Sequence, residues 1–258
     1  MAEGVATYEH DYWSKRDRSH QTINTWKGYL RTMLKVPQQG SLTVDFLLQA
    51  IVANTKPQTD TRFRACVHYA KVLELCELPG AIKLKNLQKK PKPGPRAIPS
   101  DDAIIKLVDA VRGERYGWCI AAMATFGCRT GEVPSLQLND DGTASCLTIK
   151  TKLSLPEERT CFAYPGEWIE RWDLHNVYIP GGVRWLTPQS WDAKRSENWV
   201  AAWRQWRCRS VFKAISDELT PGFDLYNLRH RWAMRSIEAN INQSLCAQAM
   251  GHTLKEHE

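Results

Sequence analysis

A basic, proline-rich segment in the first half of the chain constrains the fold more than any other feature. Residues 89–96 read KKPKPGPR, with three prolines in five positions. Proline lacks an amide proton and fixes φ, so this segment cannot lie inside a helix. We therefore predict an extended linker at residues 89–99, between one domain at 1–88 and another at 100–258.

The positive charge of the chain is concentrated around and before this linker. Residues 1–99 contain 16 Lys and Arg against 8 Asp and Glu, whereas residues 100–258 contain 19 against 20. Six of the basic residues lie between Lys83 and Arg96, with no acidic residue among them. This block is typical of contact with a polyanion, because each neutralised phosphate releases counterions. A linker kept soluble by lysine would have the same composition, so the sequence leaves both interpretations open.

Apolar periodicity predicts a small helical domain before the linker. Apolar residues recur at helical spacing from Ile23 to Leu34, more briefly after Thr43, and from Phe63 to Leu73. The last of these helices is predicted to begin near Thr59-Asp60 and to stop at Pro79-Gly80. The apolar faces are expected to form the core, and three basic side chains on opposite faces are candidates for contact with a partner: Arg31, Arg62 and Arg64.

The second domain is predicted to be mainly α-helical with a small antiparallel sheet. Ser100 resembles a helix cap before an apolar run, and a further helix is expected from Gly117 to Phe126. Short β-type runs at residues 146–149 and 159–162 are joined by a turn-forming segment. Further helices are predicted at residues 166–174, 193–218, 225–239 and 242–250.

Cysteine spacing and hydropathy exclude several classes of protein. The eight cysteines are scattered without a Cys-x-x-Cys pair, which argues against a zinc site and favours free thiols in a reduced compartment. No apolar run approaches membrane-spanning length, and the N-terminus lacks a signal-peptide pattern. We therefore expect a soluble, cytoplasmic protein without a membrane partner.

Four short motifs follow one another in the second domain. Residues 127–132 read GCRTGE, 150–152 read KTK, 226–230 read YNLRH and 250–252 read MGH. Their order resembles the active-site boxes of the tyrosine recombinase, or phage integrase, family. The resemblance implies a two-domain clamp around double-stranded DNA, with a helical core-binding domain at 1–88 and a catalytic domain at 100–258. It also makes Lys89, Lys90, Lys92 and Arg96, together with the three arginines of the first domain, candidate DNA contacts.

Strand transfer through a tyrosine needs donors that stabilise the phosphorane and an acid that protonates the departing 5′ oxygen. Arginine suits the first task because its planar fork binds two oxygens and stays charged. The resemblance assigns this task to Arg129 and Arg229, with Glu132 one turn beyond Arg129 as its support. It implies that His252 also contacts the scissile phosphate.

The remaining catalytic positions are Tyr226 and a lysine. The family usually has histidine where Tyr226 stands, three residues before Arg229 and on the same helical face. With an ordinary pKa of about 10, a phenol suits donation to phosphate better than proton abstraction. The resemblance implies that the general acid is a lysine between the two strands. Lys150 and Lys152 both qualify by position, and the Thr-Lys-Leu context favours Lys152.

The nucleophile of the family is a tyrosine shortly after the last box, and residues 253–258 contain none. We therefore expect residues 1–258 to bind DNA without cleaving it. The family acts as homotetramers on DNA in the integration or excision of mobile elements, whereas this chain by itself is expected to be monomeric. No metal or other cofactor is implied.

Two alternative functions share these features. A type IB topoisomerase uses a similar set of arginine, lysine and histidine on one duplex. A non-catalytic DNA-binding protein derived from an integrase would explain Tyr226 and the missing nucleophile.

Overall fold

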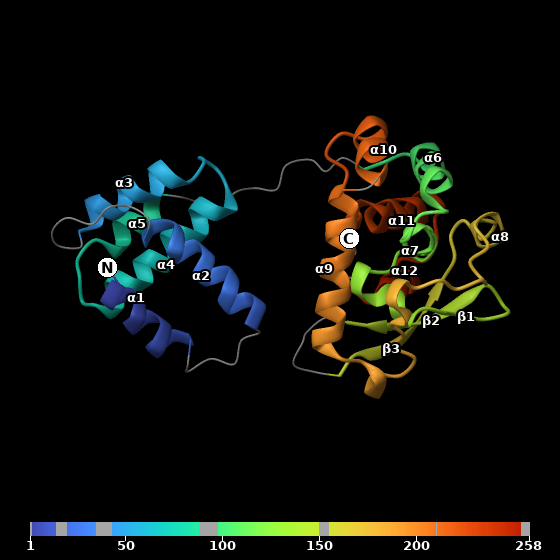
Figure 1. Ribbon diagram of the computed structural model, residues 1–258, viewed down its shortest axis with the longest axis horizontal. Helices are drawn as coiled ribbons and strands as arrows, with labels where there is room; N and C mark the ends of the chain where they lie inside the picture. The colour runs from blue at the N-terminus through green and yellow to red at the C-terminus, as the bar shows by residue number, and fades with distance from the viewer. Residues whose placement is uncertain are drawn as a thin grey trace. The chain divides into compact units, whose positions relative to one another are not determined.

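The chain divides into two compact units, Met1–Gly94 and Pro95–Glu258. The computed structural model describes residues 2–13, 20–34, 43–87, 98–149, 155–209 and 211–253 (Figure 1). Residues 89–97 of the predicted linker, and both candidate lysines near residue 151, lie outside these ranges.

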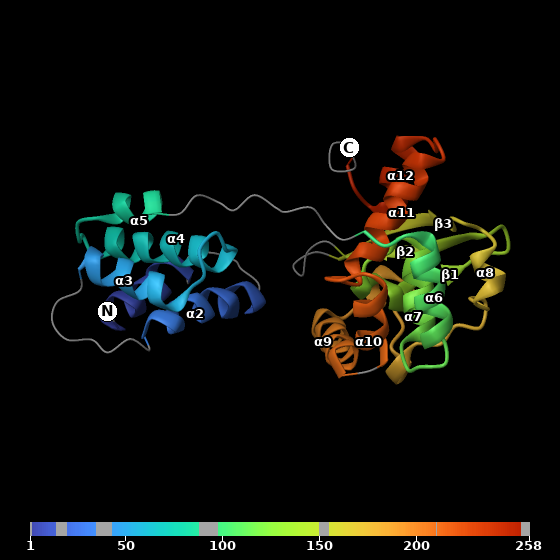
Figure 2. The ribbon, with the colours of Figure 1, turned by 90° about the horizontal axis from the view of Figure 1, so that it is seen from above.

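The first unit is helical, as its apolar periodicity predicted. Its elements are α1 (Ala2–Tyr8), a π-helical turn η1 (Glu9–Trp13), α2 (His20–Leu34), α3 (Val44–Asn54), α4 (Asp60–Leu75) and α5 (Ala81–Leu87) (Figure 2). Thr43 and Thr59 cap α3 and α4, since their hydroxyls accept the amides of Phe46 and Arg62 at 3.2 and 3.3 Å. The sequence did not predict α1 or α5.

The end of α4 differs from the prediction. The helix stops at Leu75, before the proline-glycine pair that was expected to end it. Glu77 adopts a positive φ of 54°, and the Leu78 amide donates to the Leu73 carbonyl at 2.9 Å. This turn satisfies the last helical carbonyls, so the chain leaves the helix without needing proline as a stop.

The second unit is mainly α-helical with one small antiparallel sheet, as the sequence predicted for this part of the chain. Its elements are α6 (Asp101–Val111), α7 (Gly117–Phe126), the 3₁₀ helix η2 (Thr130–Ser135), β1 (Gln137–Leu138), β2 (Thr143–Thr148), β3 (Glu157–Phe162), α8 (Trp168–Arg171), η3 (Pro180–Gly182), η4 (Pro188–Ser190), α9 (Ala193–Arg209), α10 (Val211–Leu219), α11 (Tyr226–Glu238) and α12 (Gln243–Met250). The sheet order is β1-β2-β3, and Cys146 on β2 faces Arg159 on β3. Figure 1 places this sheet along one side of the unit, away from α6 and α10.

Several element bounds differ from those predicted. The helix expected at 166–174 is the single turn α8, because Asp173 adopts a φ of 51° and the Leu174 amide bonds back to the Ile169 carbonyl at 2.9 Å. The helix expected at 193–218 corresponds to α9 and α10, with residue 210 between them outside the described ranges. The two-residue strand β1 carries too little periodicity to have been predicted.

The packing of α7 against α11 positions the candidate site. Every residue of α7 is buried, and Gly127 ends the helix at a φ of 62°. A Cβ at Gly127 would lie 2.8 Å from the Trp232 ring, so only glycine allows α11 to approach this closely. Trp232 also donates through Nε1 to the Thr125 carbonyl at 3.0 Å. The end of α7, where Arg129 follows, is therefore fixed against the helix that carries Arg229.

No helix in the described ranges is long and apolar enough to cross a bilayer. Six of the eight cysteines are buried as free thiols, whereas Cys76 is partly exposed and Cys208 exposed.

Candidate active site

The structure brings Arg129, Glu132, Arg229 and His252 together from three separate parts of the second unit. Nη1 of Arg129 lies 2.6 Å from Oε1 of Glu132, and Nη1 of Arg229 lies 3.9 Å from Oε2 of the same carboxylate. Nη2 of Arg229 in turn lies 2.8 Å from Nε2 of His252. Residues far apart in the sequence thus form one continuous polar cluster.

Glu132 is the centre of this cluster. Its carboxylate is 0% exposed and accepts the Arg129 amide at 2.8 Å and the Ile149 amide at 3.3 Å. Burial by itself raises the pKa of Glu132, but Arg159, Arg129 and Arg229 outweigh it and hold the pKa below its ordinary value. The carboxylate is therefore charged and offsets the positive charge that the site concentrates.

Arg129 is the guanidinium of the cluster that reaches the surface. It stands at the N-cap of the 3₁₀ helix η2, and its side chain is 22% exposed. The predicted support by Glu132 is present as both a backbone and a side-chain contact. This arrangement leaves part of a fixed guanidinium open to an anion from solvent.

Arg229 is completely buried. Its Nη1 donates to the Gly127 carbonyl at 2.6 Å, and its Nη2 donates to the Met250 carbonyl as well as contacting His252. Burial lowers the pKa of Arg229 and Glu132 opposes that effect. An arginine in such a place still carries its charge.

His252 is held by the end of α12. Gly251 adopts a φ of 63°, the Gly251 amide donates to the Gln248 carbonyl and the His252 amide to the Ala247 carbonyl, both at 2.9 Å. This pair of bonds is a Schellman turn. A guanidinium can only donate, so Nε2 of His252 accepts from Arg229, and the proton of the neutral ring is on Nδ1.

Tyr226 lies beside this cluster at the first residue of α11. Its side chain is 39% exposed, and its ring meets the His230 ring edge-on at 4.9 Å. The Asp224 carboxylate accepts the Tyr226 amide at 2.9 Å and so fixes the start of the helix. The phenol is thus accessible while Arg229, on the same helix, is not.

Sequence reasoning missed Arg159, which joins the cluster from β3. Its Nη2 donates to Oε2 of Glu132 at 2.9 Å, and its side chain is only 8% exposed. The signal was present in the strand pattern, since alternation places Arg159 on the same face as the buried Cys161. An arginine on the buried face of a strand requires a carboxylate partner.

The candidate DNA contacts of the first unit have different surroundings. Arg62 donates through Nε to the Thr55 hydroxyl at 3.0 Å and through Nη2 to the Val52 carbonyl at 3.2 Å, so it holds the end of α3. Arg64 is exposed and pairs loosely with Asp60 at 3.4 Å. The Arg31 side chain and the linker residues Lys89, Lys90, Lys92 and Arg96 lie outside what the structure describes, as do Lys150 and Lys152.

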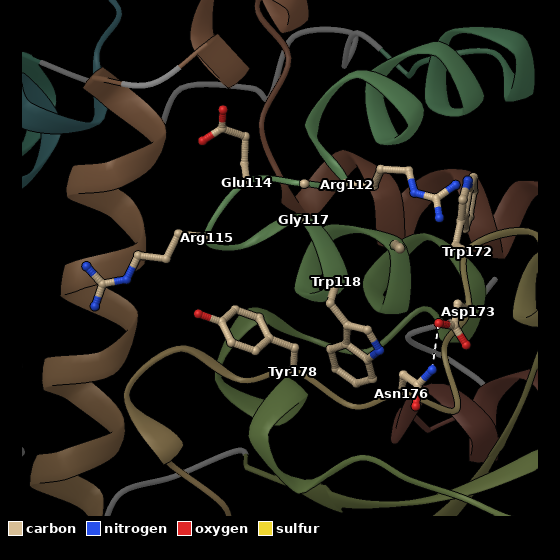
Figure 3. Close-up of a pocket in the computed structure, with 11 residues that line it drawn as sticks. Arg112, Glu114, Arg115, Gly117, Trp118, Trp172, Asp173, Asn176 and Tyr178 are labelled. Carbon is tan, nitrogen blue, oxygen red and sulfur yellow. Dashed lines mark hydrogen bonds between the residues drawn. The ribbon is translucent and has the colours of Figure 1, made fainter.

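A separate pocket of about 350 Å³ lies at the opposite end of α7 (Figure 3). Its lining includes Arg112, Trp118, Trp172 and Tyr178, and none of the residues that line it belongs to the cluster around Glu132. The candidate site is thus distinct from this pocket.

Comparisons with known proteins show what the fold of this chain resembles. A family model described as the XisA/XisC excisase second domain matches residues 2–88. A lambda integrase(75–356) dimer bound to a COC′ core site has a similar structure, with a TM-score of 0.60 at 11% identity, covering 98% of this chain and 95% of that chain. A lambda integrase tetramer bound to a Holliday junction gives a TM-score of 0.61 at 11% identity, with coverages of 100% and 76%.

The Tn1549 transposon integrase (aa 82–397) in complex with circular intermediate DNA gives a TM-score of 0.59 at 12% identity, with coverages of 98% and 93%. A comparison with curated protein sequences gave no match. At these identities the likeness is one of fold.

Proposed function

Because the chain has the tyrosine-recombinase fold that its motifs predicted, we propose that it is a site-specific DNA recombinase that exchanges strands through a 3′-phosphotyrosine. The observation that carries this proposal is the cluster in which Glu132 holds Arg129 and lies beside Arg229, with His252 bonded to Arg229. Two fixed guanidinium groups and an imidazole at one point suit a phosphate that gains negative charge in the transition state.

In the proposed function, the contact between Arg229 and His252 breaks before Arg229 binds a phosphate. Arg229 is 0% exposed in the free protein, and His252 occupies its Nη2. A phosphate therefore replaces this bond: Nη2 of Arg229 donates to one phosphate oxygen, and Nε2 of His252 donates to another once it carries a proton. Arg129, already open to solvent, makes the first contact and needs no rearrangement.

The other groups have supporting roles. Lys152, or else Lys150, follows β2 and precedes β3 in the sequence, and it protonates the departing 5′ oxygen. Tyr226 donates to the phosphate from the accessible side of α11. The first unit and the basic linker hold the duplex as one half of a two-domain clamp. The match of residues 2–88 to a family model described as the XisA/XisC excisase second domain supports a role of this unit in recombination.

Cleavage of suicide DNA tests the proposal. In a chain extended after residue 258 by a tyrosine-bearing segment, Arg129→Ala or Arg229→Ala should slow cleavage by about 10²–10³, as expected for the loss of one oxyanion donor. Binding should fall much less, because these residues contact one phosphate among many. Arg171→Ala, which removes an exposed ion pair with Asp109, is the control and should leave cleavage unchanged.

Three outcomes would replace the proposal. Cleavage at the parental rate in either arginine variant would remove the assigned residues from the chemistry. Relaxation of supercoiled plasmid without exchange between two sites would favour a type IB topoisomerase. Binding without cleavage in the extended chain would favour a DNA-binding protein, an alternative for which Tyr226 in place of histidine is the supporting observation.

A further inference from the structure

Arg159 connects three parts of the second unit on which the cluster depends. Besides its bond to Glu132, its Nη1 donates to the Thr148 hydroxyl on β2 at 2.9 Å. Its Nε donates to the Ala249 carbonyl in α12 at 2.8 Å. Because the side chain is 8% exposed, these donors act inside the protein rather than toward DNA.

The Ala249 carbonyl lies in the last turn of α12, where carbonyls have no helical partner. Arg229 donates to the next carbonyl along the chain, that of Met250. Two arginines from different elements therefore fix consecutive carbonyls at the helix end from which His252 follows. Thr148 packs closely against this helix end, since a Cβ added at Gly251 would lie only 3.0 Å from the Thr148 side chain.

We propose that Arg159 is a positioning residue, an inference that rests on the proposed function. Arg159 sets the orientation of His252 relative to Arg229 and holds Glu132 against Arg129. It acts through these residues and does not touch the phosphate. Its three guanidinium nitrogens each reach a different acceptor, whereas the donors of a lysine ammonium all lie on one nitrogen atom.

The protonation of His252 reports this role directly. In residues 1–258 the His252 ring accepts at Nε2 from Arg229, so its two ring nitrogens should give well-separated ¹⁵N resonances. These resonances are assigned to His252 by their loss in His252→Gln. Arg159→Lys keeps a positive charge beside Glu132 but loses the hold on Ala249. The two His252 resonances should then converge as the ring exchanges between tautomers.

Arg235→Lys is the matched control. Arg235 is also a buried arginine, 5% exposed, that pairs with an acid, Asp101, and donates to backbone carbonyls. It has no contact with His252 among its described partners, so the His252 resonances should stay in place at a comparable loss of thermal stability. If Arg159→Lys leaves them unchanged, or Arg235→Lys moves them equally, the positioning role is wrong.

A milder change covers the case in which Arg159→Lys fails to fold. Thr148→Val removes only the acceptor of Nη1 and should produce a smaller convergence in the same direction, and unchanged resonances would again overturn the inference. Affinity for duplex DNA, measured on the same proteins, separates the two claims. Absence of binding in the parent would contradict the recombinase function, whereas the resonances still decide the role of Arg159.

Discussion

At the scale of single residues, Glu132 shows how a buried charge is held. Three arginines lie within 4 Å of its carboxylate, which is 0% exposed. Removing the one negative charge would leave like charges facing each other in a place that water does not reach. The cost of such a change is larger than the net contribution of the pairs themselves.

Glu132→Gln should therefore lower the free energy of unfolding of the second unit by about 3–5 kcal/mol, measured by chemical denaturation. Glu238→Gln is the control, because Glu238 pairs with Arg231 at 2.9 Å from a 52% exposed position. That change should cost at most about 1 kcal/mol. Equal effects of the two substitutions would show that the Glu132 cluster contributes no more than a surface pair.

In the first unit, His68 is likewise an ionisable residue with a buried side chain. It is 5% exposed, and its Nδ1 bonds to the Tyr8 hydroxyl at 2.7 Å. Burial, helped by Arg64, lowers the pKa of His68 to about 4. Between that value and the ordinary pKa of about 6.5, the unfolded chain binds a proton that the folded chain excludes.

The stability of the first unit should therefore be fully present above pH about 6.5 and fall as the pH decreases toward 4, by on the order of 3 kcal/mol. Hydrogen exchange of the α4 amides as a function of pH measures this loss. His68→Gln should flatten the dependence between pH about 4.5 and 6.5, where carboxylates contribute little. An unchanged slope in that variant would assign the dependence to other groups.

At the scale of elements, the glycine that ends α7 sets the distance between two helices. Gly127→Ala should destabilise the second unit in two ways, by strain at a φ of 62° and by a clash with the Trp232 ring at 2.8 Å. The strain costs about 1–2 kcal/mol and overpacking about 1–3 kcal/mol more. Denaturation of the variant measures the sum.

Gly142→Ala separates the two contributions. Gly142 also has a positive φ, of 79°, but a Cβ there would meet nothing within 4 Å. It should show the strain alone. A Gly127→Ala effect no larger than that of Gly142→Ala would mean that α11 moves away without cost, and that the approach of the two helices is not fixed.

The linker is the element whose charge tests DNA binding. Replacing Lys89, Lys90 and Lys92 by alanine should reduce the slope of log affinity against log salt by up to about three units, roughly one for each lost phosphate contact. Replacing the same lysines by arginine keeps the charge and should leave the slope as it was. A slope unaffected by alanine would assign these lysines to solvation.

At the scale of the whole molecule, the two compact units carry different parts of the proposed function. The positive excess lies in residues 1–99, whereas the cluster around Glu132 lies in the second unit. Binding and chemistry should therefore be separable by measurement. Tyr226 is the last tyrosine in the sequence, and it lies on the same helix as Arg229.

Residues 1–258 should bind duplex DNA but form no covalent complex with a nicked suicide substrate. In the proposed function Tyr226 donates to the phosphate from the helix that carries Arg229, and a group on that side is poorly placed for in-line attack from the opposite side of the phosphorus. A denaturing gel of protein incubated with labelled DNA is the measurement. A covalent band that disappears in Tyr226→Phe would make Tyr226 the nucleophile and contradict its role as a donor.

The sequence by itself determined the features that depend on neighbours along the chain. The bounds of α7, the caps at Thr43, Thr59 and Ser100, and the contact of Arg129 with Glu132 all follow from rules that act within one turn. The helical character of both units followed from periodicity. The predicted helix ends were wrong where a local turn outweighed the apolar periodicity, as at Glu77 after α4 and Asp173 after α8.

Only the tertiary structure decided how the residues of the separate sequence motifs contact one another. Arg159 bonds to a carbonyl 90 residues away and Arg229 to one 102 residues away, and no periodicity reports such pairs. Tyr226 and Arg229 share a helix, yet one is 39% exposed and the other buried, because α7 and the end of α12 cover only Arg229. Spacing fixes which residues lie on a common face. Which of them is enclosed depends on the elements packed against that face, and those come from distant parts of the chain.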